Sequence, residues 1–213
     1  SSAERRLVEG WELDEMVKWM AESTRLAAKY GLIPNIATEH TTVTDPNAIK
    51  RLYRAGLENG GKKVCIADTT GAATPVSVKN LIGFFQEEIL AGYPDIDIDW
   101  HGHDDRGLSV VNSMTALDAG AKRVHGTALG IGERAGNTPL EQLMLNLKMA
   151  NDPRRQNLVS IPDLAGYSSH IFGVPIRINY PGIGEKVGMT ASGIHAAAML
   201  KAQKLGIEPG APY

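Results

Sequence analysis

A regular alternation of amphipathic helical segments with short apolar segments constrains the fold of this chain most strongly. One helical segment comes first, and four strand–helix pairs follow it. The expected helices are residues 12–30, 46–59, 76–92, 107–121 and 138–150, and the expected strands are 32–40, 63–70, 95–103 and 122–130. Strands joined by helices run parallel, because a parallel crossover usually uses a helix. The sequence therefore predicts an α/β fold with a parallel sheet.

Polar residues occur at or just after the end of every expected strand. They are Glu39, Thr69, His101, His103 and Thr127. A doubly wound sheet and a (β/α)8 barrel share the same local alternation, but polar groups delivered to one rim by successive strands are typical of the barrel. Four strands make half of a barrel. The alternation stops at about residue 151, and two further helices are expected at 161–172 and 189–205. We therefore predict a partial barrel over residues 1–150 and a small helical subdomain over 151–213.

Composition narrows the class of function. A chain of 213 residues with 43% hydrophobic residues can bury a sizeable core. The net charge of −2, without a run of Lys or Arg, offers no basic surface for nucleic acid. Cys65 is the only cysteine, which excludes an intrachain disulfide framework and fits a reducing compartment. No apolar stretch approaches the roughly 18 residues of a membrane span, and no secretory signal is recognisable. We expect a soluble, cytoplasmic protein that acts on small molecules.

Two histidines, His101 and His103, occupy alternate positions at the end of the third expected strand. Side chains at i and i+2 of a strand point to the same face, with Cα atoms about 6.6 Å apart, so both imidazoles can reach one metal ion. Ile98 and Trp100 fall on the opposite face, which indicates one packed and one chemically active face. A polar strand end with hydrogen-bonded histidines is the alternative interpretation.

A glycine-rich loop, GIGERAGN at residues 130–137, follows the last expected strand. Glycines at a strand-to-helix turn often serve only the backbone geometry, so the loop alone is weak evidence. Its position one strand–helix unit after His101 and His103 makes it more informative. Asn137 could add a neutral oxygen ligand near the same rim.

Four segments resemble a known enzyme family. They are HGHDDRGLSVVNSMTALDAGAKRVHGTALGIGERAGNTPLEQLMLNLK, ATEHTTVTDP, IADTTGAATP and TASGIHAAAMLKA. They are similar to the metal-dependent acyl-CoA condensing enzymes, namely 2-isopropylmalate, homocitrate and citramalate synthases. The resemblance implies a TIM-barrel catalytic domain, of which residues 1–150 would hold strands five to eight. It also implies addition of the methyl carbon of acetyl-CoA to the ketone of a 2-oxo acid, followed by thioester hydrolysis.

The resemblance assigns roles to six residues. It implies metal ligation by His101, His103 and Asn137, binding of the oxo-acid carboxylate by Thr69, a place near the reacting groups for Glu39, and general acid/base catalysis by His195. A mixed set of nitrogen and oxygen ligands accepts zinc, manganese or magnesium. Thr69 could instead only hydrogen-bond its strand end, and Glu39 could be a solvated carboxylate. The family also implies a homodimer in which the region of His195 closes over a barrel mouth, often that of the neighbouring subunit.

The chain departs from the family pattern in three ways. Asp104 replaces an asparagine, and Arg106 replaces a residue that is often apolar. The family's Asp-Arg motif, which supplies a third metal ligand and an arginine, is absent. We therefore expect a portion of a longer or split enzyme, inactive alone, with a non-catalytic scaffold as the alternative. Among substrates we favour 2-oxoisovalerate, with homocitrate or citramalate formation as alternatives. A hydroxymethylglutaryl-type lyase ranks lower, because its catalytic cysteine is missing from the glycine-rich loop.

Overall fold

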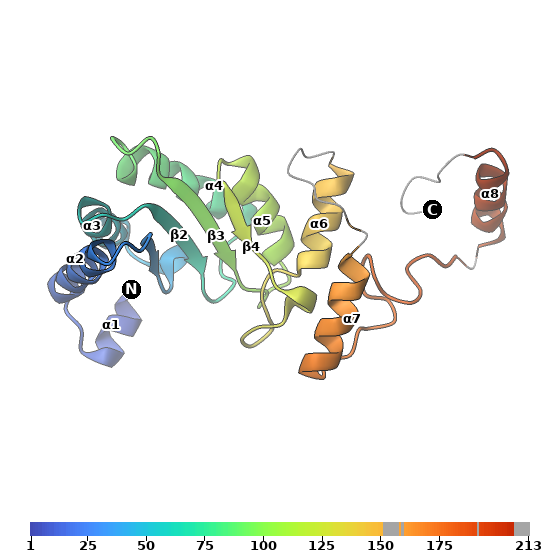
Figure 1. Cartoon of the computed structure of the whole chain (residues 1–213), viewed down its shortest axis with the longest axis horizontal. Helices are drawn as coiled ribbons and strands as arrows, with labels where there is room; N and C mark the ends of the chain where they lie inside the picture. The colour runs from blue at the N-terminus through green and yellow to red at the C-terminus, as the bar shows by residue number, and fades with distance from the viewer. Residues whose placement is uncertain (151–157, 159, 191, 207–213) are drawn as a thin grey trace.

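The computed structural model of the protein describes residues 1–150, 158, 160–190 and 192–206. Four parallel strands form one sheet in the order β1 (Asn35–Thr38), β2 (Lys63–Asp68), β3 (Asp97–Gly102) and β4 (Arg123–His125). Each strand therefore pairs with its neighbour in the sequence, as Figure 1 shows. A doubly wound sheet would reverse its strand order at a switch point. The sequential order agrees with the barrel alternative and confirms four β/α units.

Helices connect the strands where the sequence predicts them. The connecting helices are α3 (Pro46–Glu58), α4 (Pro75–Phe84) and α5 (Ser109–Asp118), while α2 (Leu13–Lys29) precedes β1 and α6 (Leu140–Met149) follows β4. Asp45 caps α3 by accepting from the amides of Asn47 and Ala48, and a proline follows it at the first helical position. The short helix α1 (Ala3–Glu9) was not predicted, and the strands are shorter than expected.

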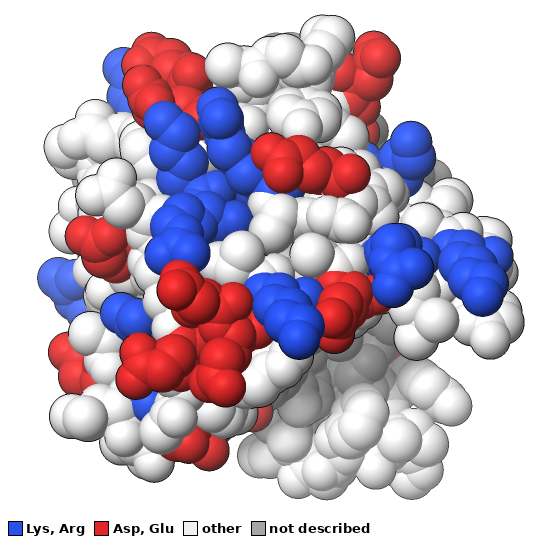
Figure 2. Space-filling view, turned by 90° about the vertical axis from the view of Figure 1, so that its left-hand side faces the viewer, with Lys and Arg blue, Asp and Glu red and all other residues white. Residues whose placement is uncertain are grey.

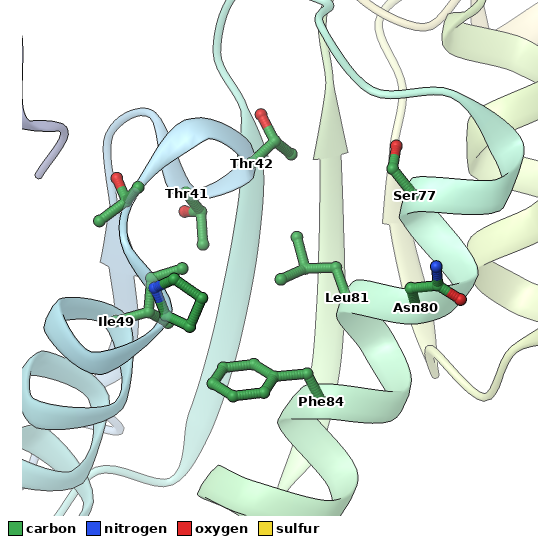
Figure 3. A pocket seen from close by; sticks show the side chains of 9 residues that line it. Thr41, Thr42, Ile49, Ser77, Asn80, Leu81 and Phe84 are labelled. Carbon is green, nitrogen blue, oxygen red and sulfur yellow. The ribbon is translucent and has the colours of Figure 1, made fainter.

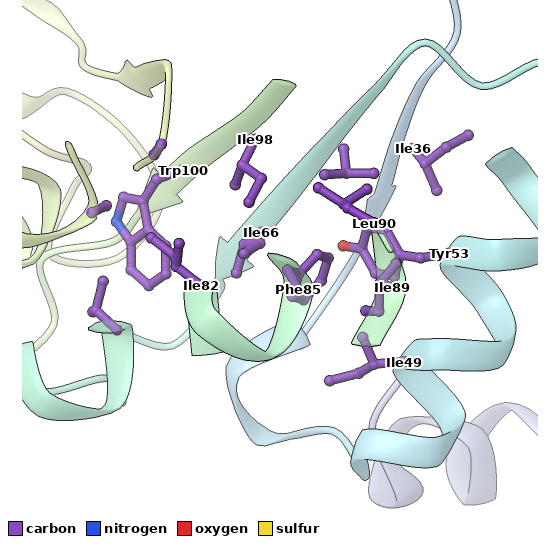
Figure 4. Close-up of a cluster of buried hydrophobic side chains, with 14 of the residues drawn as sticks. Ile36, Ile49, Tyr53, Ile66, Ile82, Phe85, Ile89, Leu90, Ile98 and Trp100 are labelled. Carbon is purple, nitrogen blue, oxygen red and sulfur yellow. The ribbon is translucent and has the colours of Figure 1, made fainter. Parts of the chain in front are cut away.

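The apolar core lies between the sheet and the connecting helices (Figure 4). On this face the strands carry Ile36, Val64, Ile66, Ile98 and Trp100, all at most 3% exposed. They pack against helix side chains that include Ile49, Tyr53, Val78, Ile82, Phe85 and Ile89. Each fully buried side chain of this kind stabilises the fold by about 1.5–3 kcal/mol. This packing fixes which strand positions point to the opposite face.

The opposite face of the sheet carries small and polar side chains. Ala37, Cys65 and Asp99 are neighbours in the strand register. His101, the next residue of β3 on this face, pairs with His125 of β4. Asp99 is only 2% exposed, because its carboxylate accepts hydrogen bonds from Asn35 at 3.1 Å and from Arg123 at 3.0 Å. The prediction that His101 lies on the face opposite Ile98 and Trp100 is confirmed.

The region after the sheet contains α7 (Ile161–Phe172), as predicted, and α8 (Gly193–Lys204), which begins after the predicted start at residue 189. The segment between them contacts α6 through Tyr180, whose hydroxyl donates to Glu141 at 3.4 Å. Figure 1 shows α8 at the opposite end of the molecule from α2 and β1. The predicted domain boundary at residue 151 lies outside the described residues, so the division into two domains stays a prediction.

Charged side chains of both signs intermingle at the end of the molecule that carries α2 and α3 (Figure 2). Arg51 pairs with Asp14 at 2.5 Å, and Lys50 pairs with Glu88 at 2.6 Å. This visible face therefore has no large region of one sign. Within the described part of the chain, no helix combines the length and the apolar character needed to cross a membrane.

Candidate metal centre

His101 and His103 meet at the carboxyl end of β3. Their Nε2 atoms lie 3.2 Å apart, and their ring centroids lie 5.0 Å apart. His103 is 7% exposed, and His101 is partly buried. Burial, helped by the neighbouring His103 and His125, lowers the pKa of His101 and favours its neutral form. Neutral imidazole is the form that binds metals. The predicted convergence of the two rings is therefore observed.

The glycine-rich loop is joined directly to the histidine segment. His103 and Asn137 pair across an isolated antiparallel bridge. The amide of Asp104 donates to the carbonyl of Gly136 at 2.9 Å. The amide of Thr138 donates to the carbonyl of Gly102 at 3.1 Å. These backbone contacts place Asn137 beside His103.

The buried carboxylate of Glu141 holds the beginning of this loop. It accepts two contacts from the amide of Leu129, at 2.9 and 3.1 Å. Leu129 has a φ of 58°, a left-handed conformation that a leucine rarely adopts. The carboxylate therefore stabilises a strained turn at the start of the loop.

The donor atoms fit part of a metal-ligand set. Two nitrogens that each lie 2.0–2.1 Å from a tetrahedral zinc ion are about 3.3 Å apart, close to the observed spacing of the two Nε2 atoms. The Oδ1 atom of Asn137 is buried and has no hydrogen-bond partner. It lies so close to Gly132 that a Cβ there would be 2.5 Å from it. Within the described residues, no group of three or more His, Cys, Asp or Glu side chains could hold a metal. The candidate ligand set therefore contains only two such side chains, His101 and His103, together with the amide of Asn137.

Arg134 connects the loop to two strand ends, a role that the sequence analysis missed. Its guanidinium makes a bidentate pair with Asp105, at 2.7 and 2.9 Å, and also donates to the carbonyl of Thr69. The same guanidinium lowers the pKa of Asp105. Its Nη2 atom lies 3.1 Å from Nδ1 of His103. A metal bound to Nε2 of His103 requires the ring proton to be on Nδ1, and a protonated Nδ1 cannot accept from the guanidinium. We therefore expect metal binding to release the contact between Arg134 and His103.

Thr69 and Glu39 lie on neighbouring strand ends and have other partners in the structure. The Thr69 hydroxyl accepts from the amide of His40 at 2.8 Å, which is the alternative interpretation that Thr69 hydrogen-bonds its strand end. The O–H of Thr69 can still donate to another group. The Glu39 carboxylate is 46% exposed and pairs with Arg5 at 3.3 Å. Glu39 also lines a cavity of about 340 Å³ with Trp11 and Trp19. Neither the hydrogen bond of Thr69 nor the ion pair of Glu39 involves His101 or His103.

His195 lies in the first turn of α8, after Ser192 at the N-cap position. Figure 1 places α8 beyond α6 and α7, away from the strands. The chain therefore brings His101, His103 and Asn137 together but does not bring His195 to them.

Comparison with known proteins decides the family. The family model described as HMGL-like matches residues 1–167. The chain belongs to the HMGL-like family. It is 35% identical over 201 residues to a homocitrate synthase of Methanocaldococcus jannaschii, and 32% identical over 209 residues to a 2-isopropylmalate synthase of Methylacidiphilum infernorum. Both matches cover 94% of this HMGL-like chain.

The HMGL-like chain spans half or less of the length of these curated relatives, namely 48% and 40%. Its fold is similar to the crystal structure of hydroxymethylglutaryl-CoA lyase from Pseudomonas aeruginosa, with a TM-score of 0.70 and 16% identity. That match covers 95% of this chain and 65% of the lyase chain. The four parallel β/α units are therefore part of a barrel of the same fold.

A second cavity of this HMGL-like chain, also of about 340 Å³, lies on the helical side of the sheet (Figure 3). Leu81 and Phe84 of α4 face Ile49 of α3 across it, and Thr41 and Thr42 close one end. None of the six predicted site residues lines it. The candidate chemistry therefore belongs to the strand ends.

The loop geometry of this HMGL-like chain gives a first testable prediction. Gly136 has a φ of 104°, and a Cβ there would collide with the carbonyl oxygen of Gly130. Gly136→Ala should lower the free energy of unfolding by about 1–3 kcal/mol, because the loop must adopt a strained conformation. Denaturant unfolding measures this change.

Gly83→Ala is the matched control, because no heavy atom lies within 4 Å of its added Cβ inside α4. This control should gain about 0.5–1 kcal/mol, since alanine favours a helix. Equal stability of Gly136→Ala and the unmodified protein would contradict the loop geometry.

Proposed function

We propose that this chain is a portion of an acetyl-CoA-dependent 2-oxo-acid condensing synthase, an acyltransferase, and is inactive alone. The convergence of His101 and His103 beside the glycine-rich loop carries this proposal, because the pair lies at the carboxyl ends of the barrel strands. Barrel enzymes place their active sites at this end. The similarity to homocitrate and 2-isopropylmalate synthases supports the same reaction class.

In this proposal His101, His103 and Asn137 hold a divalent ion, with zinc, manganese and magnesium as the candidates. When bound, such an ion supplies Lewis-acid polarisation of the ketone of a 2-oxo acid. Arg134 and Asp105 keep the loop in place, because their bidentate pair does not depend on His103.

The other predicted residues bind substrate or transfer protons. Thr69 can donate its hydroxyl proton to the oxo-acid carboxylate while still accepting from His40. Glu39 would act near the reacting groups after giving up its pairing with Arg5. His195 would act as a general acid or base, and its place on α8 fits delivery to a partner's barrel mouth in a homodimer. We expect the protein to act in the cytoplasm.

Among the 2-oxo acids we propose 2-oxoisovalerate, which makes the enzyme a 2-isopropylmalate synthase. The full-length protein should release coenzyme A from acetyl-CoA with a kcat/KM at least about 10-fold higher for 2-oxoisovalerate than for pyruvate or 2-oxoglutarate, as expected for pockets that discriminate by side-chain size. A thiol-trapping assay measures the release. A preference for pyruvate would indicate citramalate formation, and a preference for 2-oxoglutarate would indicate homocitrate formation.

The same assay separates a synthase from a scaffold. Metal binding without coenzyme A release for any of the three acids would favour a non-catalytic scaffold. A hydroxymethylglutaryl-type lyase fits less well, because residues 130–137 contain no cysteine. Cys65 is buried on β2, and burial raises its pKa to about 12, so its thiol is not a nucleophile at neutral pH.

A further inference from the structure

A row of polar side chains continues from His101 across the concave face of the sheet. His101 on β3 pairs in register with His125 on β4, and their Nδ1 atoms lie 3.3 Å apart. The Nε2 atom of His125 lies 3.6 Å from Oδ2 of Asp99. None of these contacts uses the Nε2 atom of His101, which faces His103.

The contact between His125 and Asp99, at 3.6 Å, is longer than a hydrogen bond and acts through charge, and together with the His101–His125 contact it favours one tautomer of His101. The Asp99 carboxylate can only accept, so it favours the ring proton of His125 on Nε2. The Nδ1 atom of His125 then carries a lone pair and accepts from Nδ1–H of His101. A neutral imidazole has one N–H, so Nε2 of His101 is left with its lone pair directed toward His103.

The Asp99 carboxylate is held in place by hydrogen bonds from two other side chains. Its side chain is 3% exposed, and its two oxygens also accept from Arg123 Nε at 3.0 Å and Asn35 Nδ2 at 3.1 Å. These contacts hold the carboxylate below His125, whose ring is still 39% exposed. Without the carboxylate, His125 could place its proton on either nitrogen.

We infer that His125 is a positioning residue for the metal centre, because it holds His101 in the tautomer that leaves Nε2 free to bind, and that Asp99 orients His125. This inference rests on the proposed function, since it concerns how this chain prepares a ligand for the ion. Groups that orient a metal-binding histidine through its second nitrogen typically change metal affinity 10–100-fold when they are lost.

The experiment compares two substitutions at His125 in the full-length protein. His125→Leu removes the acceptor, whereas His125→Asn places an amide oxygen close to the position of Nδ1. Zn²⁺ affinity, measured by competition with a chelator, should fall about 10–100-fold in His125→Leu and recover for the most part in His125→Asn. His170→Leu removes a histidine from α7 and should leave the affinity unchanged.

A second measurement needs no metal. Nitrogen NMR of the histidine rings should show His101 protonated on Nδ1 in the metal-free protein and in His125→Asn, and a mixture of tautomers in His125→Leu. Thermal unfolding of each variant checks that the fold is retained.

The outcomes distinguish a failure of the proposed metal centre from a failure of the positioning role of His125. If the unmodified protein does not bind Zn²⁺, the proposed metal centre fails. If it binds Zn²⁺ but His125→Leu retains both the affinity and the His101 tautomer, the positioning role of His125 is wrong while the metal centre stands. An equal loss of affinity in His125→Leu and His125→Asn would also overturn the role, because it would show that an acceptor at this position is not what matters.

Discussion

Replacing either His101 or His103 with alanine is expected to lower the rate of condensation by the full-length enzyme by about 10³-fold or more. A Lewis acid contributes several kcal/mol to stabilising the transition state, and each 1.4 kcal/mol corresponds to a factor of ten in rate. The two Nε2 atoms lie 3.2 Å apart and are the two nitrogen ligands of the proposed centre. Loss of either imidazole would leave one histidine and Asn137 as the ligands from this chain, which is too few to hold the ion.

The measurement is the kcat/KM for coenzyme A release at saturating metal, together with the bound metal content. His170→Ala, on α7, is the matched control and should retain full activity. Unchanged turnover in His101→Ala or His103→Ala would remove that histidine from the proposed centre.

His195→Ala is expected to lower kcat by about 10²–10⁴-fold, the usual contribution of a general acid or base. His195 lies in the first turn of α8, after the N-cap residue Ser192. Metal content and oxo-acid binding should stay unchanged, since His195 lies away from the strand ends.

Mixing experiments show whether His195 acts across a dimer. Inactive His195→Ala combined with inactive His103→Ala should regain activity if each subunit supplies one residue to the other's site. Full turnover by His195→Ala alone would make this a structural histidine.

The side-chain pattern predicted the sheet well, because packing follows strand parity. Ile98 and Trp100 are buried against helices, and His101 projects to the other face with His103 beside it. The helix expected over residues 46–59 also matches α3, Pro46–Glu58. These features depend on neighbours along the chain, which a sequence displays directly.

Features that depend on contacts between distant segments were not predictable. The helix expected over residues 76–92 ends at Phe84 and continues as a π-turn over Phe85–Ile89, because the amide of Leu90 bonds to the carbonyl of Phe85. An apolar periodicity does not distinguish the two forms. Arg123 lies 24 positions after Asp99 in the sequence, and although its side chain is 47% exposed, its Nε atom donates to the buried carboxylate of Asp99.

The site shows the same division between local and distant information. The spacing of His101 and His103 was sufficient to predict that they converge. The contact of Arg134 with Asp105 and His103 depends on a left-handed residue, with a φ of 54°, in a loop of the next β/α unit. A charged Glu-Arg pair inside a glycine-rich loop was the only signal for it. Glu39 and Thr69 were found at their strand ends, but their present partners are Arg5 and His40.

The most direct test of the metal centre is a crystal structure of the full-length protein loaded with Zn²⁺, with diffraction measured at the zinc absorption edge. We predict an anomalous peak about 2.0–2.1 Å from the Nε2 atoms of both His101 and His103, with Asn137 at or beside it. A fully loaded crystal whose zinc lies elsewhere, with the two imidazoles still hydrogen-bonded to each other, would contradict it.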